Sequence, residues 1–219
     1  SNSGMYYLKY DPANRRYTEK QYMTSGESTI SSNTVTFIIS DIKNDLWIGT
    51  DKGLNHITRS ELLKQEPSFS NYWLNYHFKT AISIDSAIIC GTIENGIKVY
   101  LTGIGKFDEY PEMFNELSDK TITIFSRHKN YLFVGTTSGL YQYDLKTGIL
   151  ESYVMPQKNI RRIFIDSRET VWINSQEFGI YKTDLKLSFF RHYELIPEEI
   201  ESIVDDERLL SLQTHAEQS

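Results

Sequence analysis

The chain has 219 residues, of which 39% are hydrophobic and 24% are charged, and its formal net charge is −6. This composition excludes a disordered chain, and the lack of a basic cluster argues against nucleic-acid binding. No apolar run approaches the ~18 residues that a membrane-spanning helix needs.

The first full structural unit begins near residue 29, after strand-like segments at 4–20. In this unit a run at 33–41 leads through a polar turn into Leu46-Trp47-Ile48-Gly49-Thr50, and a tight turn then ends at Gly53. Its apolar runs are short and alternate with polar residues, which predicts β-strands and not helices. Each such unit divides into four strands, which we number a to d from its start.

The same pattern recurs three more times along the chain. Its last two strand-b residues are Gly91-Thr92, Gly135-Thr136 and, with a departure, Asn174-Ser175. The glycines that close the following turns stand at 53, 96, 139 and 179, which are 43, 43 and 40 residues apart. Four short strands repeating every ~40–45 residues predict an all-β fold, a β-propeller of four-stranded antiparallel blades. These turns need a left-handed backbone, which glycine provides.

The repeat divides residues 1–219, taken as a single propeller domain, into complete and partial blades. We predict a half-blade at 4–20, blades at about 29–76, 79–116, 118–155 and 159–195, and a half-blade at 200–214. The two half-blades would pair to close a propeller of about five blades, which removes exposed strand edges. A fragment of a larger propeller would show the same two ends, so both alternatives stay open.

The first copy resembles the two-component regulator propeller repeat. The resemblance rests on Asn33, Val35, Ile38, Asp41 and the run from Leu46 to Leu54. It implies the periplasmic sensor region of a Bacteroides-type hybrid two-component histidine kinase that binds oligosaccharide and signals across the membrane. It also implies a homodimer in the parent receptor and membrane attachment through a segment outside this chain. Any kinase activity would lie outside the chain as well.

No residue pattern points to catalysis, a metal or a cofactor. Cys90, the one cysteine, stands in an apolar run and is expected to be a buried, inert thiol. The five histidines lack zinc-ligand spacing, and Asp41, Asn44 and Asp45 are better explained by turn chemistry than by calcium. We therefore predict no enzyme activity, no catalytic residues and no cofactor.

Three tryptophans could stack on sugars. Trp47 and Trp172 recur at one position of strand b, which favours packing between blades. Trp73 stands in an aromatic stretch at 71–78, where we favour an outer strand over a binding patch.

In a propeller the links between blades and the turns between strands b and c share one face. Hydroxyl, amide and charged groups gather there in this sequence, as recognition of a polyol requires. The candidate ligand-binding residues are Asn33, Lys52, Lys79, Asn95, Lys120, Asn159, Arg161 and Gln176. We expect a ligand-sensing domain; the alternatives are a protein-interaction scaffold and a propeller carbohydrate-active enzyme.

Overall fold

A computed structural model describes residues 4–24, 29–64, 66–108, 111–176, 179–184 and 190–193. Among them are four four-stranded antiparallel sheets and one two-stranded hairpin. The sequence-predicted β-propeller fold of four-stranded blades is therefore confirmed. Two short helices accompany the sheets, α1 (Arg59–Leu62) and η1 (Glu112–Leu117).

Each sheet is built from four strands that follow one another in the chain and lie side by side in the same order. The hairpin is β1 (Met5–Asp11) and β2 (Arg16–Tyr22). The first sheet is β3 (Val35–Ser40), β4 (Leu46–Thr50), β5 (Gly53–Ile57) and β6 (Ser70–Tyr72). The second is β7 (Phe78–Ile84), β8 (Ala87–Thr92), β9 (Ile97–Leu101) and β10 (Lys106–Asp108). The third is β11 (Ile122–His128), β12 (Tyr131–Thr136), β13 (Gly139–Asp144) and β14 (Ile149–Val154). The fourth is β15 (Ile160–Ile165), β16 (Thr170–Ser175), β17 (Gly179–Asp184) and β18 (Phe190–Tyr193).

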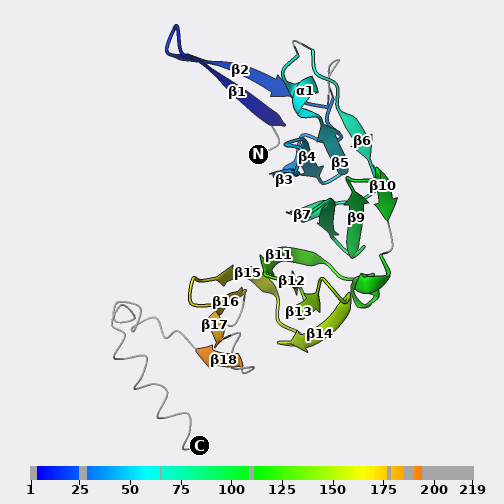
Figure 1. Cartoon of the computed structure of the whole chain (residues 1–219), viewed down its shortest axis with the longest axis vertical. Coiled ribbons are helices and arrows are strands. Elements are labelled where there is room, and N and C mark those ends of the chain that lie inside the picture. Colours follow the sequence, from blue (N-terminus) through cyan, green and yellow to red (C-terminus); the bar gives the residue numbers. More distant parts are fainter. Residues whose placement is uncertain are drawn as a thin grey trace, which may run out of the picture.

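The sheets follow one another around an arc, and the first strand of each sheet lies on its concave side (Figure 1). These inner strands contact each other in sequence, β3 with β7, β7 with β11 and β11 with β15. The hairpin β1–β2 and the fourth sheet stand at opposite ends of the arc (Figure 1). The predicted half-blade at 200–214 lies outside the described residues, so closure into five blades stays a prediction.

The hydrophobic core is divided into clusters, one at each junction. Trp47 and Phe78 are buried between the first and second sheets, Ile89 and Ile122 between the second and third. Phe133 and Ile160 are buried between the third and fourth sheets. Each sheet therefore depends on its neighbours to cover its apolar faces.

Two strand-b glycines allow this close packing. A Cβ added at Gly91 would lie 2.6 Å from Ile122 of the third sheet, and one at Gly135 would lie 2.8 Å from Ile160 of the fourth. Any side chain at these positions would push the next inner strand away. The repeated Gly-Thr ending of strand b thus follows from blade packing.

The other half of the Gly-Thr pair closes the next turn. The hydroxyls of Thr50, Thr92 and Thr136 donate to the carbonyls of Gly53, Gly96 and Gly139 at 2.7–2.9 Å. These three glycines and Gly179 have positive φ, as predicted. The hydrogen bond and the left-handed glycine together define a tight turn.

The predicted outer strand of the first sheet is present as β6, but it does not include Trp73. Strand β6 ends at Tyr72, and Trp73 adopts φ 49° in the link that follows. Its ring packs on Phe107 at 4.7 Å and Phe78 at 6.0 Å, so it covers the junction of the first two sheets. Tertiary packing of the indole outweighs the β-propensity of the local sequence.

None of the helices among the described residues has the length and apolar character needed to cross a membrane.

Candidate functional site

One face of the arc is built from a contact that every sheet repeats. The first residue after strand b donates its backbone N–H to a carbonyl in the link before strand a. The donors are Asp51, Ile93, Thr137 and Gln176, and the acceptors are Thr34, His77, Thr121 and Asn159, at 3.0–3.3 Å. We call the surface formed by these eight residues the link–turn face.

Each inner strand carries a β-bulge directly below this face. The ladder between strands a and b skips one residue in every sheet, namely Thr36, Lys79, Thr123 and Arg161. Each of these stands two residues after the link acceptor of its sheet. Bulges re-aim a side chain out of the regular alternation, and they are common beside binding sites. The fold therefore offers four equivalent positions, occupied by two hydroxyls and two cations.

The fourth sheet holds three predicted site residues in one hydrogen-bonded group. The Oε1 atom of Gln176 accepts from Asn159 Nδ2 at 2.9 Å and from the guanidinium of Arg161. The backbone of Gln176 also donates to the Asn159 carbonyl. Both Arg161 and Gln176 are exposed, so this group is ordered and open to solvent.

Lys79 occupies the equivalent bulge of the second sheet and is half-buried. Burial lowers the pKa of its ammonium group, and the positive charge of Arg161 lowers it further. The charge of Arg161 therefore acts on Lys79, although the third sheet lies between their two sheets. At the remaining bulges, the Oγ1 atoms of Thr36 and Thr123 are buried and have no hydrogen-bond partner among the described residues.

The other four predicted residues lie beside this group and are used differently. Asn33 accepts from the backbone N–H of Thr24 through its side chain and from Gly4 through its carbonyl, so it anchors the hairpin β1–β2. Asn95 donates to the Ile93 carbonyl within its own turn, and Lys120 pairs with Asp119 at 3.2 Å. Lys52 is exposed at the tip of its turn.

Sequence reasoning missed that Thr36 and Thr123 occupy bulge positions equivalent to those of Lys79 and Arg161. The signal was present, because aligning the four copies places them with Lys79 and Arg161. A bulge itself leaves no mark in the local composition, so the copies have to be compared for it to be seen.

A second cluster joins Asp41, Asp45 and His56, whose ligand atoms lie within 4.8 Å of one another. Its carboxylates already have partners. Asp41 accepts from the backbone of Lys43 and Asp45, and from Trp47 Nε1 at 3.2 Å. The fourth sheet repeats this arrangement with Asp166 and Trp172 at 3.1 Å. The cluster is therefore explained by turn chemistry, in agreement with the sequence-based preference.

Cys90 is buried, and burial raises the pKa of its thiol far above the usual range. The expectation of a buried thiol is therefore confirmed, and its inertness stays a prediction. The predicted packing role is also confirmed for Trp47, which is fully buried, stacks on His56 and packs at a tilt against Tyr100 of the second sheet. Trp172 is half-buried and lies against Lys182.

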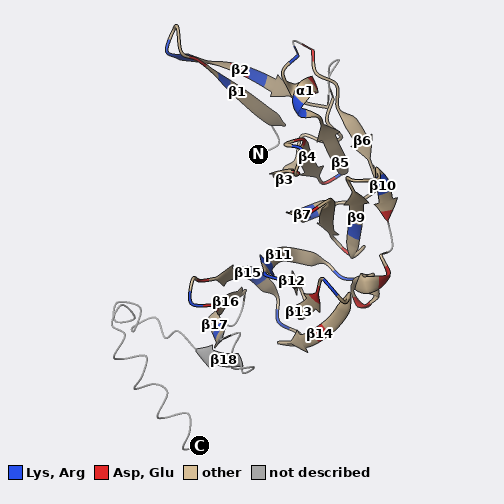
Figure 2. Ribbon diagram, viewed as in Figure 1, with Lys and Arg blue, Asp and Glu red and all other residues tan. Residues whose placement is uncertain are grey.

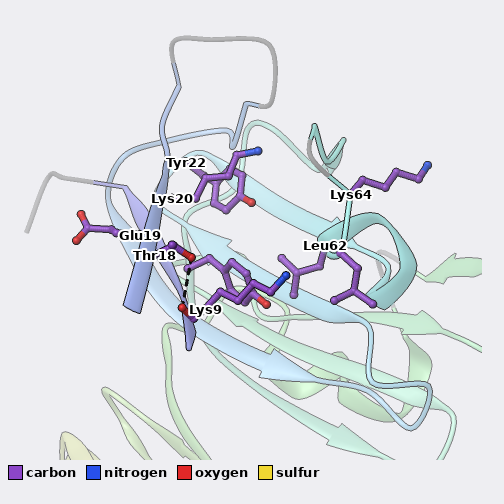
Figure 3. Close-up of a pocket in the computed structure, with 9 residues that line it drawn as sticks. Lys9, Thr18, Glu19, Lys20, Tyr22, Leu62 and Lys64 are labelled. Atoms are coloured by element: carbon purple, nitrogen blue, oxygen red, sulfur yellow. Dashed lines mark hydrogen bonds between the residues drawn. The ribbon is translucent and has the colours of Figure 1, made fainter. Parts of the chain in front are cut away.

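A cavity of about 460 Å³ lies between the hairpin and α1, lined by residues that include Lys9, Lys20 and Leu62 (Figure 3). The one hydrogen bond drawn there joins the Thr18 hydroxyl to the Lys9 carbonyl at 3.3 Å. Its lining combines three lysines, Glu19 and Thr18 with two tyrosines, Leu62 and Leu63, and it belongs to one end of the arc and not to the contact that every sheet repeats. The link–turn face is the stronger candidate site.

No protein-family model matches the chain, and no curated protein matches it. Solved structures do. One is the extracellular domain assigned to the hybrid two-component system BT3049 from B. thetaiotaomicron, with 18% identity and a TM-score of 0.65 over 89% of this chain and 26% of that one. Another is the extracellular domain assigned to the one-component system BT4673 from the same organism, with 21% identity and a TM-score of 0.60 over 80% and 24%.

A third is PorZ, a surface component of the type-IX secretion system of Porphyromonas gingivalis, with 13% identity and a TM-score of 0.61 over 88% of this chain and 31% of that one. The chain thus spans about a quarter to a third of the length of these structures. At these identities the likeness establishes the propeller fold.

Proposed function

We propose that this chain is a ligand-sensing part of the extracytoplasmic region of a bacterial two-component sensor, and that it binds oligosaccharide in the periplasm without turning it over. The observation that carries the proposal is the link–turn face of the propeller. Four equivalent bulge residues lie below it, and Asn159, Arg161 and Gln176 form a hydrogen-bonded group on it. The likeness to extracellular domains assigned to bacterial signalling systems supports it.

The face suits a polyol because its groups complement hydroxyls. Gln176 and Asn159 supply amide groups and Thr121 and Thr137 supply hydroxyls, while the bulge residues Lys79 and Arg161 directly below the face supply charged donors. Sugars present many hydroxyls that both donate and accept, so a mixed array of this kind can satisfy them. The prior contact between Asn159, Arg161 and Gln176 reduces the entropy lost on binding.

Signalling would follow from how the arc is built. Each junction is an apolar cluster, so the sheets are coupled through packed side chains. A ligand that touches the inner strands of several sheets favours one relative position of those sheets over others. The parent receptor, including its dimer and its membrane segment, is part of the same proposal.

The test is a thermal-shift screen of the 219-residue chain against a panel of plant and host oligosaccharides. A ligand at about 100 times its dissociation constant should stabilise the fold by about 2.7 kcal/mol. We expect a saturable shift with one glycan class, without product formation.

Asn159→Ala combined with Gln176→Ala should abolish that shift. Asn130→Ala, at the opposite end of the third sheet, should retain it. A partner protein captured with no response to any glycan would overturn the proposal in favour of a scaffold. Turnover of a glycan would overturn it in favour of an enzyme.

A further inference from the structure

Two cations occupy equivalent bulges on either side of the third sheet. Lys79 stands in β7 and Arg161 in β15, while the intervening bulge in β11 carries Thr123. Figure 2 shows positively charged residues on β7 and β15, on the concave side of the arc. The charge of Arg161 acts on Lys79, so the two residues lie near each other although 82 residues of sequence separate them.

The spacing between these two bulges is set by rigid parts of the fold. β7 contacts β11, and β11 contacts β15. Gly91 and Gly135 are pressed against Ile122 and Ile160, so the three inner strands are held at close approach. Strands held in this way keep the two cations at a constant separation that does not depend on the loops.

Neither cation is neutralised within the described part of the chain. No side-chain hydrogen bond or ion pair joins Lys79 to another described residue, and the Arg161 guanidinium donates to the neutral amide of Gln176 while the Arg161 carbonyl accepts from Arg162 at 2.9 Å. At the opposite end of the same sheets the cations do have carboxylates, because Arg127 pairs with Asp85 and Lys129 with Glu169. Two neighbouring cations without an anion are electrostatically unfavourable, and a bound anion would remove that cost.

Among the described residues, three acidic groups lie on the link–turn side, namely Asp119, Glu94 and Asp51. Asp119 is held by Lys120, and Glu94 is exposed in the turn of the second sheet. Asp51 belongs to the first sheet, which adjoins Lys79 but is two sheets away from Arg161. Lys79 and Arg161 stand in the second and fourth sheets, so the positive region spans the third sheet between them.

We propose that Lys79 and Arg161 together bind an anionic group, a carboxylate or a sulfate, carried by the oligosaccharide ligand. The proposal rests on the proposed function and names the class of saccharide, an acidic one. Arg161 suits this role because its planar guanidinium can donate two parallel hydrogen bonds to such a group, while Lys79 adds a compact charge. Gln176 accepts from the guanidinium and holds it in place, and Asn159 donates to the same oxygen of Gln176.

The test measures binding to four probes by isothermal titration calorimetry at constant ionic strength. The probes are trigalacturonate, a 6-sulfated galactotriose, neutral galactotriose and sodium sulfate. Each is titrated into the wild-type chain, into Lys79→Gln, Arg161→Gln and the double variant. Lys146→Gln and Arg168→Gln are the controls, because they remove the same charge from exposed turns at the other end of the sheets.

We expect one of the two acidic saccharides to bind, with each single variant weakening it at least about tenfold and the double variant abolishing it. The controls should stay within about twofold of wild type. The saccharide that binds distinguishes carboxylate from sulfate. The dissociation constant should also rise with salt in the wild type and much less in the double variant.

The outcomes separate this inference from the proposed function. Equal binding of neutral galactotriose by all variants would overturn the anion site and keep the saccharide sensor. Sulfate binding that is lost in the double variant, without saccharide binding, would keep the anion site and overturn the saccharide ligand. No binding of any probe would overturn the anion site.

Discussion

The first and fourth sheets contain the same local structure in two different surroundings. In both, a tryptophan of strand b donates its indole N–H to an aspartate six residues earlier, at 3.2 Å from Trp47 to Asp41 and 3.1 Å from Trp172 to Asp166. Trp47 is fully buried, with Tyr100 of the second sheet packed on it at 4.6 Å. Trp172 is only half-buried. The hydrogen bond is therefore a local property of the turn, and the burial is contributed by the next blade.

The neighbours of the two tryptophans differ in the same way. The residue paired with Trp47 across the strands is His56, which stacks on it at 4.2 Å, and the residue paired with Trp172 is Lys182, whose ammonium lies 5.2 Å from the ring. An aromatic ring suits a site that is buried by the next blade, while a lysine suits a site that stays in contact with solvent.

The largest expected effect is the loss of the buried tryptophan. Trp47→Ala should lower the free energy of unfolding by about 3–5 kcal/mol, because it leaves a cavity between two sheets. Trp172→Ala should cost about 1–2 kcal/mol, since its site is already partly open to water. Urea denaturation followed by tyrosine fluorescence would measure both. Equal costs would contradict the view that the next blade provides the burial.

The second effect concerns the residue two positions further along strand b. Gly135→Ala should cost about 1–3 kcal/mol, because its Cβ would lie 2.6 Å from Ile124 and 2.8 Å from Ile160. Asn174→Ala, at the equivalent position of the fourth sheet, should change stability by less than about 0.5 kcal/mol, because Asn174 is exposed. The same denaturation experiment applies. A large cost for Asn174→Ala would show that a further blade packs on it.

The third effect is a pH dependence present in the first sheet and not in the fourth. Burial lowers the pKa of His56, and this outweighs the opposing effect of Asp45. Since the folded-state pKa lies below the unfolded value of about 6.5, the native state resists protonation there. Stability should be highest above that value and should fall as pH drops through the folded pKa.

His56→Phe keeps the stacking on Trp47 and removes the titration, so it should flatten the melting temperature between pH 7.5 and 5. Lys182→Phe in the fourth sheet is the matched control and should leave the pH dependence unchanged. An unaltered slope in His56→Phe would assign the effect to another group.

The smallest effect is expected for Asp166, at the partly open turn. The hydrogen bond from Trp172 is the main cause that lowers the pKa of this carboxyl, and the backbone N–H of Thr170 adds to it. Its contribution to stability is therefore present above the unfolded pKa and lost as the pH falls through the folded one. Asp166→Asn should destabilise the fold at pH 7 and should have no effect at pH 2. A constant difference across that range would contradict this assignment.

The repeat in the sequence determined most of the fold. The alternation of short apolar runs, the Gly-Thr endings and the turn glycines each reflect a backbone requirement that recurs in every blade, so four copies could be recognised and their strands placed. Trp73 was misplaced because its conformation depends on Phe107 and Phe78, which belong to the next sheet.

For the candidate site, the sequence determined which polar groups stand near the links and turns, because these follow from the strand order. Only the tertiary structure decided which of them share one surface. Asn159, Arg161 and Gln176 meet within the fourth copy through the link contact and the bulge, and blade packing brings Lys79 of the second copy near enough for the charge of Arg161 to act on it. Asn33, Asn95 and Lys120 are instead drawn into hydrogen bonds and an ion pair. A repeat specifies its own strands through short-range geometry, but the contacts between repeats depend on packing that no single copy encodes.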